Sequence, residues 1–133
     1  IGNRMFDSDE ADTKIEIDSI SIDEFLKNRN GTINFIKMDI QGAEVLAIDG
    51  MKNTLRNNKH LKIIQEWWPA SIRKYGREPD SHLNFLEGLG FNFYVVDEHS
   101  NQLTQITIPK LMETYPNEDL EDVNLFCINE KTN

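Results

Sequence analysis

Two carboxylate side chains in this sequence each end a hydrophobic segment, a position where binding and catalytic residues of α/β proteins often lie. Asp39 ends a hydrophobic segment that begins at residue 33, and Glu66 ends a second one that begins at Leu61. If these segments are neighbouring parallel strands, about 4.8 Å apart, both carboxylates reach one crevice beyond the sheet. Such a pair can bind a cation, hold a ribose or an amine, or act as a general base. We therefore predict that Asp39 and Glu66 are catalytic candidates.

Polar and aromatic side chains surround the two acids. Gln41 and Glu44 stand at the expected start of a helix, where free N–H groups and the positive end of the helix dipole gather. Trp67 and Trp68 are adjacent, so in an extended chain one packs inward while the other borders the crevice. A purely structural interpretation stays open, because capping alone favours an acid at a helix start by about 0.3–1 kcal/mol.

The sequence shows no pattern typical of a metal centre. His60, His82 and His99 are scattered, and none has metal-ligand spacing with another ligand. The acidic run at residues 7–12 lacks the third ligand and the glycine of a calcium loop, and we interpret it and the run at 118–122 as solvated loops. We predict no metal site. A metal-dependent hydrolase built on the two carboxylates stays as a remote alternative.

The hydrophobic pattern predicts an α/β scaffold for these candidates. Residues 33–39 and 61–66 are apolar on both faces, which is typical of strands inside a parallel sheet. Residues 42–57 have apolar positions at helical spacing, and Gly50 predicts a kink or a division into two short helices. Further strands are expected at 14–20, 91–97 and 123–128, helices after Ser21 and near 80–90, and a loop with a short strand at 101–116. This order predicts a Rossmann-like three-layer sandwich with a largely parallel sheet and helices on both faces.

Length and charge narrow the class of protein. The chain has 133 residues and 15.5 kDa, which fits a single domain. It carries 23 acidic and 14 basic residues, and a net charge of −9 disfavours nucleic acid and anionic membrane surfaces as partners. No apolar run approaches the ~20 residues of a membrane helix. The one cysteine, Cys127, excludes an internal disulfide and suits a reducing compartment, so we predict a cytoplasmic protein.

One run of residues resembles a known family. The stretch from Phe35 to Glu44, FIKMDIQGAE, is similar to the hallmark of FkbM-type methyltransferases, roughly F-I-K-hydrophobic-D-hydrophobic-E-G-A-E. The flanking segments that also resemble the family are residues 21–26, 45–55, 63–69, 86–94 and 123–128. The resemblance implies a partial class I methyltransferase fold with an antiparallel last strand. It also implies methyl transfer from S-adenosylmethionine, commonly to an oxygen of a sugar or natural product.

The resemblance also implies roles for the crevice residues. Asp39 and Gln41 would contact the cofactor, and Asp39 or Glu66 would do the chemistry. The acceptor, a small molecule or a glycan, would meet the remaining candidates, which are Glu44, Trp67 and Trp68. Gln41 stands where the family usually has Glu, which removes one negative charge from the crevice.

The sequence departs from the family in one further respect. No glycine-rich turn follows a strand near the N-terminus, where similar folds cradle the cofactor, and residues 1–13 look like a variable loop. We therefore expect the C-terminal portion of a methyltransferase domain, inactive alone. The strand at 33–39 then forms a sheet edge, which favours either a homodimer or coverage by residues 14–20. The alternative function is a non-catalytic association module.

Overall fold

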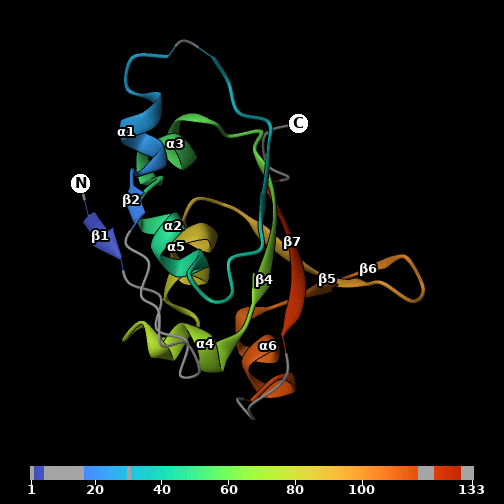
Figure 1. The fold of residues 1–133 in the computed structure, drawn as a ribbon. Coiled ribbons are helices and arrows are strands. Elements are labelled where there is room, and N and C mark those ends of the chain that lie inside the picture. The colour runs from blue at the N-terminus through green and yellow to red at the C-terminus, as the bar shows by residue number, and fades with distance from the viewer. Residues whose placement is uncertain (1, 5–16, 30, 117–121, 130–133) are drawn as a thin grey trace.

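The computed structural model describes residues 2–4, 17–29, 31–116 and 122–129. Its strands are β1 (Gly2–Arg4), β2 (Ile17–Ser19), β3 (Phe35–Met38), β4 (Lys62–Trp67), β5 (Asn92–Asp97), β6 (Gln102–Ile106) and β7 (Val123–Ile128). Its helices are α1 (Ile22–Leu26), α2 (Glu44–Asp49), α3 (Lys52–Asn57), α4 (Pro69–Lys74), α5 (Ser81–Gly88) and α6 (Ile108–Thr114). The predicted α/β class is confirmed (Figure 1).

The main sheet has the strand order β3-β4-β7-β5-β6, and β1 pairs with β2 in a separate small sheet. The expectation of a mostly parallel sheet is wrong, because only β3 and β4 pair in parallel. The physical reason is the last strand. The antiparallel β7, an orientation that the family resemblance implies, lies between β4 and β5, which run in the same direction. It thereby turns what would be parallel neighbours into two antiparallel pairs.

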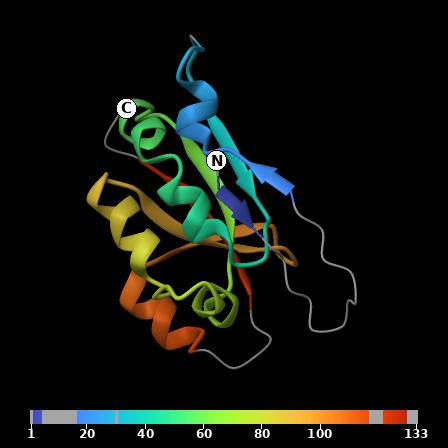
Figure 2. The same ribbon diagram turned by 60° about the vertical axis from the view of Figure 1, so that its left-hand side comes forward.

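The described helices cover one face of the main sheet, so the described part of the chain has two layers, and the expected third layer is not among them. Side chains on the covered face are buried in one hydrophobic core; in β4 and β7 they are Ile63, Gln65, Trp67, Val123, Leu125 and Cys127. The alternate side chains Ile64, Tyr94 and Phe126 are half-buried and do not pack against that core. In Figure 1 and Figure 2, α2, α3 and α5 lie together on the same side of the sheet.

Local sequence accounts for the helices that precede and follow β3. The Ser21 hydroxyl accepts a hydrogen bond from the Glu24 N–H (3.1 Å), which caps α1 as the sequence predicts. The segment 42–57 divides at Gly50 and Met51 into α2 and α3, as the glycine predicts. Residues 101–116 are not mainly a loop, because Thr107 caps α6 and Pro109 occupies its first turn.

The N-terminal expectation fits only in part. Of the strand predicted at 14–20, residues 17–19 form β2 and residues 14–16 lie outside the described residues. Among the described residues, β2 pairs with β1 and not with β3. Part of the loop expected at 1–13 is β1, and residues 5–13 lie outside the described residues. None of the helices in the described ranges is both long enough and apolar enough to cross a membrane.

Candidate active site

The carboxyl ends of β3 and β4 bring the predicted acids together. Asp39 directly follows β3, Glu66 lies near the end of β4, and the two strands pair in parallel. The Gln41 amide Nε2 donates to Glu66 Oε2 (3.1 Å) and, at a longer distance, to Asp39 Oδ1 (3.4 Å). Lys37 Nζ pairs with Asp39 Oδ2 at 3.4 Å. Gln41 therefore bridges two carboxylates that are 27 positions apart in the sequence.

A strained turn holds Gln41 in place. Gln41 has a φ of 57° and Gly42 a φ of 91°, both in the left-handed region that side chains disfavour. The Ser71 hydroxyl of α4 donates to the Gln41 carbonyl, and a Cβ at position 42 would collide with Ser71. Glu44 accepts a hydrogen bond from the Ile40 N–H through Oε1 (2.8 Å). The turn is thus fixed from both α2 and α4.

Glu44 is fully buried beneath this turn. Its second oxygen, Oε2, has no hydrogen-bond partner within the described part of the chain. The contact with Ile40 gives Glu44 a role in positioning the turn, and its predicted contact with an acceptor stays a prediction. A buried carboxylate with one free oxygen also adds negative charge beneath Glu66 and raises the pKa of that group.

Glu66 is the most perturbed acid of the site. Burial, a hydrogen bond to Asp122 and the charges of Asp122, Asp39 and Glu44 together raise its pKa from 4.5 to about 7. Near neutral pH this carboxyl therefore takes up and releases a proton easily, which suits a general base. Sequence reasoning missed Asp122, which it placed in a solvated loop. The register explains the contact, because Val123 of β7 pairs with Trp67 of β4 and so brings Asp122 beside the end of β4.

The two tryptophans separate as the alternation predicts. Trp67 has no exposed surface, and its Nε1 donates to the Pro79 carbonyl (2.9 Å), so it is a core residue and cannot meet an acceptor in this structure. Trp68 is half-buried, and its indole N–H finds no partner within the described ranges. Of the two tryptophans, only Trp68 has exposed surface, and its contact with an acceptor stays a prediction.

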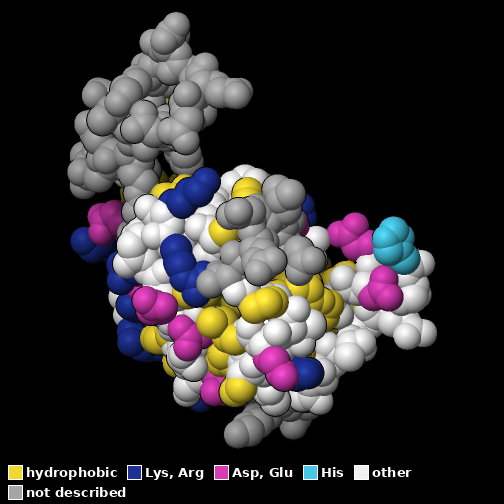
Figure 3. All heavy atoms as spheres, turned by 90° about the horizontal axis from the view of Figure 1, so that it is seen from below, with side chains coloured by type: hydrophobic (Ala, Val, Ile, Leu, Met, Phe, Trp, Pro, Cys, Tyr) yellow, Lys and Arg dark blue, Asp and Glu magenta, His cyan; other side chains and the backbone are white. Residues whose placement is uncertain are grey.

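Two cavities lie beside the sheet, one near the carboxyl end of β5 and the other near the amino end of β3. One of about 620 Å³ lies beside Asp122, at the carboxyl end of β5, and includes Asp97, His99, Tyr115 and Asn124. Figure 3 looks onto this edge and shows acidic and basic side chains around an apolar centre, with the β5–β6 hairpin projecting to one side. Asp122, which contacts Glu66, lines this cavity, whereas Glu66 and Asp39 do not.

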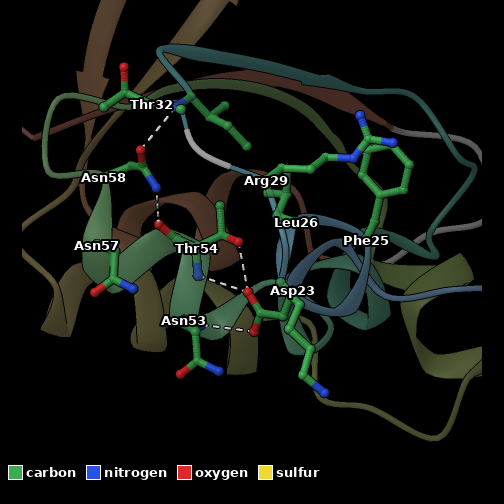
Figure 4. A pocket seen from close by; sticks show the side chains of 12 residues that line it. Asp23, Phe25, Leu26, Arg29, Thr32, Asn53, Thr54, Asn57 and Asn58 are labelled. Carbon is green, nitrogen blue, oxygen red and sulfur yellow. Dashed lines mark hydrogen bonds between the residues drawn. The ribbon is translucent and has the colours of Figure 1, made fainter.

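The second cavity, of about 760 Å³, lies near the amino end of β3 between α1 and α3 (Figure 4). Asp23, the acidic residue that lines this cavity, stabilises the fold. Asp23 accepts hydrogen bonds from Asn53 N (2.9 Å), Thr54 N (2.8 Å) and Thr54 Oγ1 (2.7 Å), which ties α1 to the start of α3. Burial opposes ionisation of Asp23, but these hydrogen bonds outweigh it and hold its pKa below the usual range. With its oxygens engaged, Asp23 is a poor ligand-binding group.

Histidine and metal chemistry gain no support from the geometry. Burial lowers the pKa of His82 to about 4, and neither of its ring nitrogens has a partner among the described residues. Within those residues, no three side chains of His, Cys, Asp or Glu gather so that they can hold a metal ion. The metal-dependent hydrolase therefore has no observation in its favour.

Comparison with known proteins gives one family. The model of the methyltransferase FkbM domain matches residues 3–93, which include β3, the turn at Gln41 and β4 but not β7 or Asp122. No curated protein and no solved structure matches the chain. Because the family match spans more than half of the 133 residues and contains the site built on Asp39 and Glu66, this chain belongs to the FkbM methyltransferase domain family.

Proposed function

We propose that this chain supplies the acceptor side of an S-adenosylmethionine-dependent methyltransferase that acts on a hydroxyl of a sugar or natural product. The observation that carries the proposal is Glu66, a half-buried carboxyl with a pKa of about 7 that Gln41 links to Asp39. A hydroxyl becomes a better nucleophile when a nearby base takes its proton, and a base with a pKa near the working pH does so most effectively. The lone, buried Cys127 further suits a cytoplasmic enzyme.

The side chains at the carboxyl ends of β3 and β4 fit part of the cofactor that the family implies. S-adenosylmethionine supplies, when bound, a methyl group on a cationic sulfonium. The exposed carboxylate of Asp39 and the amide of Gln41 offer acceptors and a donor for hydroxyl and ammonium groups, and the surrounding negative charge favours a cation. We assign this contact to Asp39 and Gln41. The sequence has no glycine-rich turn after a strand, so we further propose that the chain is the C-terminal portion of the domain.

The chain's own residues divide the remaining work. The acceptor hydroxyl donates a hydrogen bond to Glu66, and its proton would move to Glu66 as the new oxygen–carbon bond forms and the methyl–sulfur bond of the donor breaks, the sulfur keeping the electron pair. Asp122 then accepts a hydrogen bond from the protonated Glu66 and holds the proton in the pair. We assign the half-buried Trp68 to the wall of the acceptor site. Glu44 keeps the turn in place through the hydrogen bond that it accepts from the Ile40 N–H.

The test is transfer of a labelled methyl group from S-adenosylmethionine to a panel of sugar and natural-product hydroxyls, using the intact protein that contains these residues. We expect Glu66→Gln to lower the rate by roughly 10²-fold or more. The matched control is Glu87→Gln, the same change at an exposed position of α5, which should retain the rate. A Glu66→Gln protein with the unaltered rate would exclude Glu66 as the base.

A second candidate, a non-catalytic association module, is favoured by the edge of β3 along which none of the described strands pairs. Calorimetric titration with S-adenosylmethionine and S-adenosylhomocysteine separates the two candidates. Saturable binding, weakened by Asp39→Asn, supports the methyltransferase. The absence of binding by the intact protein, with its fold verified by circular dichroism, supports the module.

A further inference from the structure

The chain turns sharply between β3 and α2, and the turn contains a residue that its shape disfavours. The Ala43 N–H donates to the Ile40 carbonyl (3.2 Å) and closes the turn. Its two central residues, Gln41 and Gly42, have φ values of 57° and 91°. Positive φ at both central positions is typical of a type I′ turn, which favours Asn, Asp or Gly at each of them. The local backbone therefore does not explain why position 41 is Gln.

Ser71 of α4 holds this turn from the side. Its hydroxyl donates to the Gln41 carbonyl, which belongs to the peptide between the two residues of positive φ. One hydrogen bond therefore restrains the torsion angles of both residues. Ser71 is buried, and a Cβ on Gly42 would collide with it, so the hydroxyl is packed directly against the turn. Residues held in such disfavoured conformations depend on their surroundings to stay there.

The side chain of Gln41 explains its presence in the turn. Its Nε2 donates to Glu66 Oε2 (3.1 Å), so the amide reaches across to the end of β4. Asn suits the turn better, but its side chain is one methylene shorter and falls short of that oxygen. A hydrogen bond donated to a carboxylate favours the ionised form. The Gln41 amide therefore opposes the burial and the neighbouring charges that keep a proton on Glu66.

We propose that Ser71 is a positioning residue of the candidate active site, which holds Gln41 in the left-handed conformation from which its amide donates to Glu66. Ser71 acts through Gln41, so its influence on Glu66 ends when that amide is removed. The catalytic consequence rests on the proposed function, because the protonation of Glu66 matters to methyl transfer only if Glu66 is the base.

Titration of the Glu66 carboxyl carbon by NMR in the intact protein tests the proposal, with the signal assigned by its loss in Glu66→Gln. Ser71→Ala should raise the pKa of Glu66 above its value of about 7 by about half a unit or more. Gln41→Asn should raise it as well, and without loss of stability to urea, because Asn suits the turn. The matched control is Ser81→Ala, which removes an exposed hydroxyl that also donates to a backbone carbonyl, that of Glu78 (2.7 Å). It should leave the pKa of Glu66 unchanged.

A double variant separates positioning from a general loosening of the fold. Ser71→Ala combined with Gln41→Asn should raise the pKa of Glu66 no further than Gln41→Asn alone, because residues that act through one contact are not additive. An unchanged Glu66 pKa in Ser71→Ala would overturn the proposal. So would additive shifts in the double variant, which would show that Ser71 acts by another route.

The NMR readout does not depend on methyl transfer, so the two proposals can fail separately. If Glu66 is the base, Ser71→Ala should also move the midpoint of the kcat/KM profile to higher pH by the same amount as the Glu66 pKa. A shifted pKa with an unmoved midpoint, or with no methyl transfer in the unaltered protein, would count against the proposed function and support the positioning role of Ser71.

Discussion

Removing the Asp122 carboxylate should stabilise the protein at neutral pH. The folded pKa of Glu66, about 7, lies above its ordinary value of 4.5, so ionising Glu66 costs free energy in the folded state. The two pKa values set the direction in which this cost changes with pH. Below pH 4.5 Glu66 is protonated in both states and costs nothing, and the penalty grows between pH 4.5 and 7 and is complete above pH 7. Asp122→Asn removes the largest of the neighbouring charge effects and should abolish part of this loss, while the larger effect of burial remains.

The size of the effect follows from the shift. The whole shift, from 4.5 to about 7, corresponds to at most ~3.5 kcal/mol, at ~1.4 kcal/mol for each pKa unit. Because Glu66 is only half-buried and solvent screens its neighbours, we expect Asp122→Asn to raise the free energy of unfolding by about 1 kcal/mol at pH 8. At pH 4 the difference should fall below ~0.5 kcal/mol, since Glu66 is then protonated.

Urea unfolding followed by tryptophan fluorescence at pH 4, 6 and 8 measures this dependence. The control is Asp18→Asn, which removes the same charge from an exposed residue of β2. An equal gain in both variants would assign the effect to the net charge alone. No gain at pH 8, or an undiminished gain at pH 4, would refute the argument that Asp122 raises the pKa of Glu66.

Three further predictions concern stability, each measured by urea unfolding. Gly42→Ala should destabilise the protein by at least ~2 kcal/mol, because φ is 91° and the new methyl group meets Ser71; a neutral change would contradict this geometry. Asp23→Ala should cost about 1–2 kcal/mol through the lost hydrogen bonds to the start of α3, and a loss below ~0.5 kcal/mol would argue against the cap. Burial lowers the pKa of His82 to about 4. The contribution of neutral His82 to the free energy of unfolding is therefore fully present above pH 6.5 and is lost as the pH falls toward 4. His82→Leu should therefore flatten the acid side of the stability profile, and an unchanged profile would assign the acid loss to other groups.

Features encoded by neighbouring residues could be predicted from the sequence. The Ser21 cap, the division of the segment 42–57 at Gly50, and the two hydrophobic strands that end in acids depend on spacing within a few residues. The meeting of Asp39 and Glu66 needed one further assumption, that β3 and β4 are parallel neighbours. That assumption held because the connection through α2 and α3 is a short crossover between adjacent strands.

Features that depend on the final placement of β7 could not be predicted in the same way. Nothing in the pattern of residues 123–128 states that this strand lies between β4 and β5, and the parallel sheet expected from local pattern is therefore wrong. The contact of Asp122 with Glu66 was missed for the same reason. An acidic residue before a strand looks like a solvated loop until the neighbouring strand is known.

The carboxylates of Glu44 and Glu66, close together at the carboxyl end of β4, argue for a role beyond folding. Gln65 in the same strand is buried and uncharged, so the fold tolerates an amide in this part of β4. The hydrogen bond from Ile40 likewise needs only an acceptor at position 44, which an amide also provides, yet the residue is a buried carboxylate with a free oxygen. Placing that charge near Glu66 lowers stability and raises the Glu66 pKa. A structural turn gains nothing from this, whereas a base that works near neutral pH does, which is why we assign proton transfer to Glu66 rather than to the exposed Asp39.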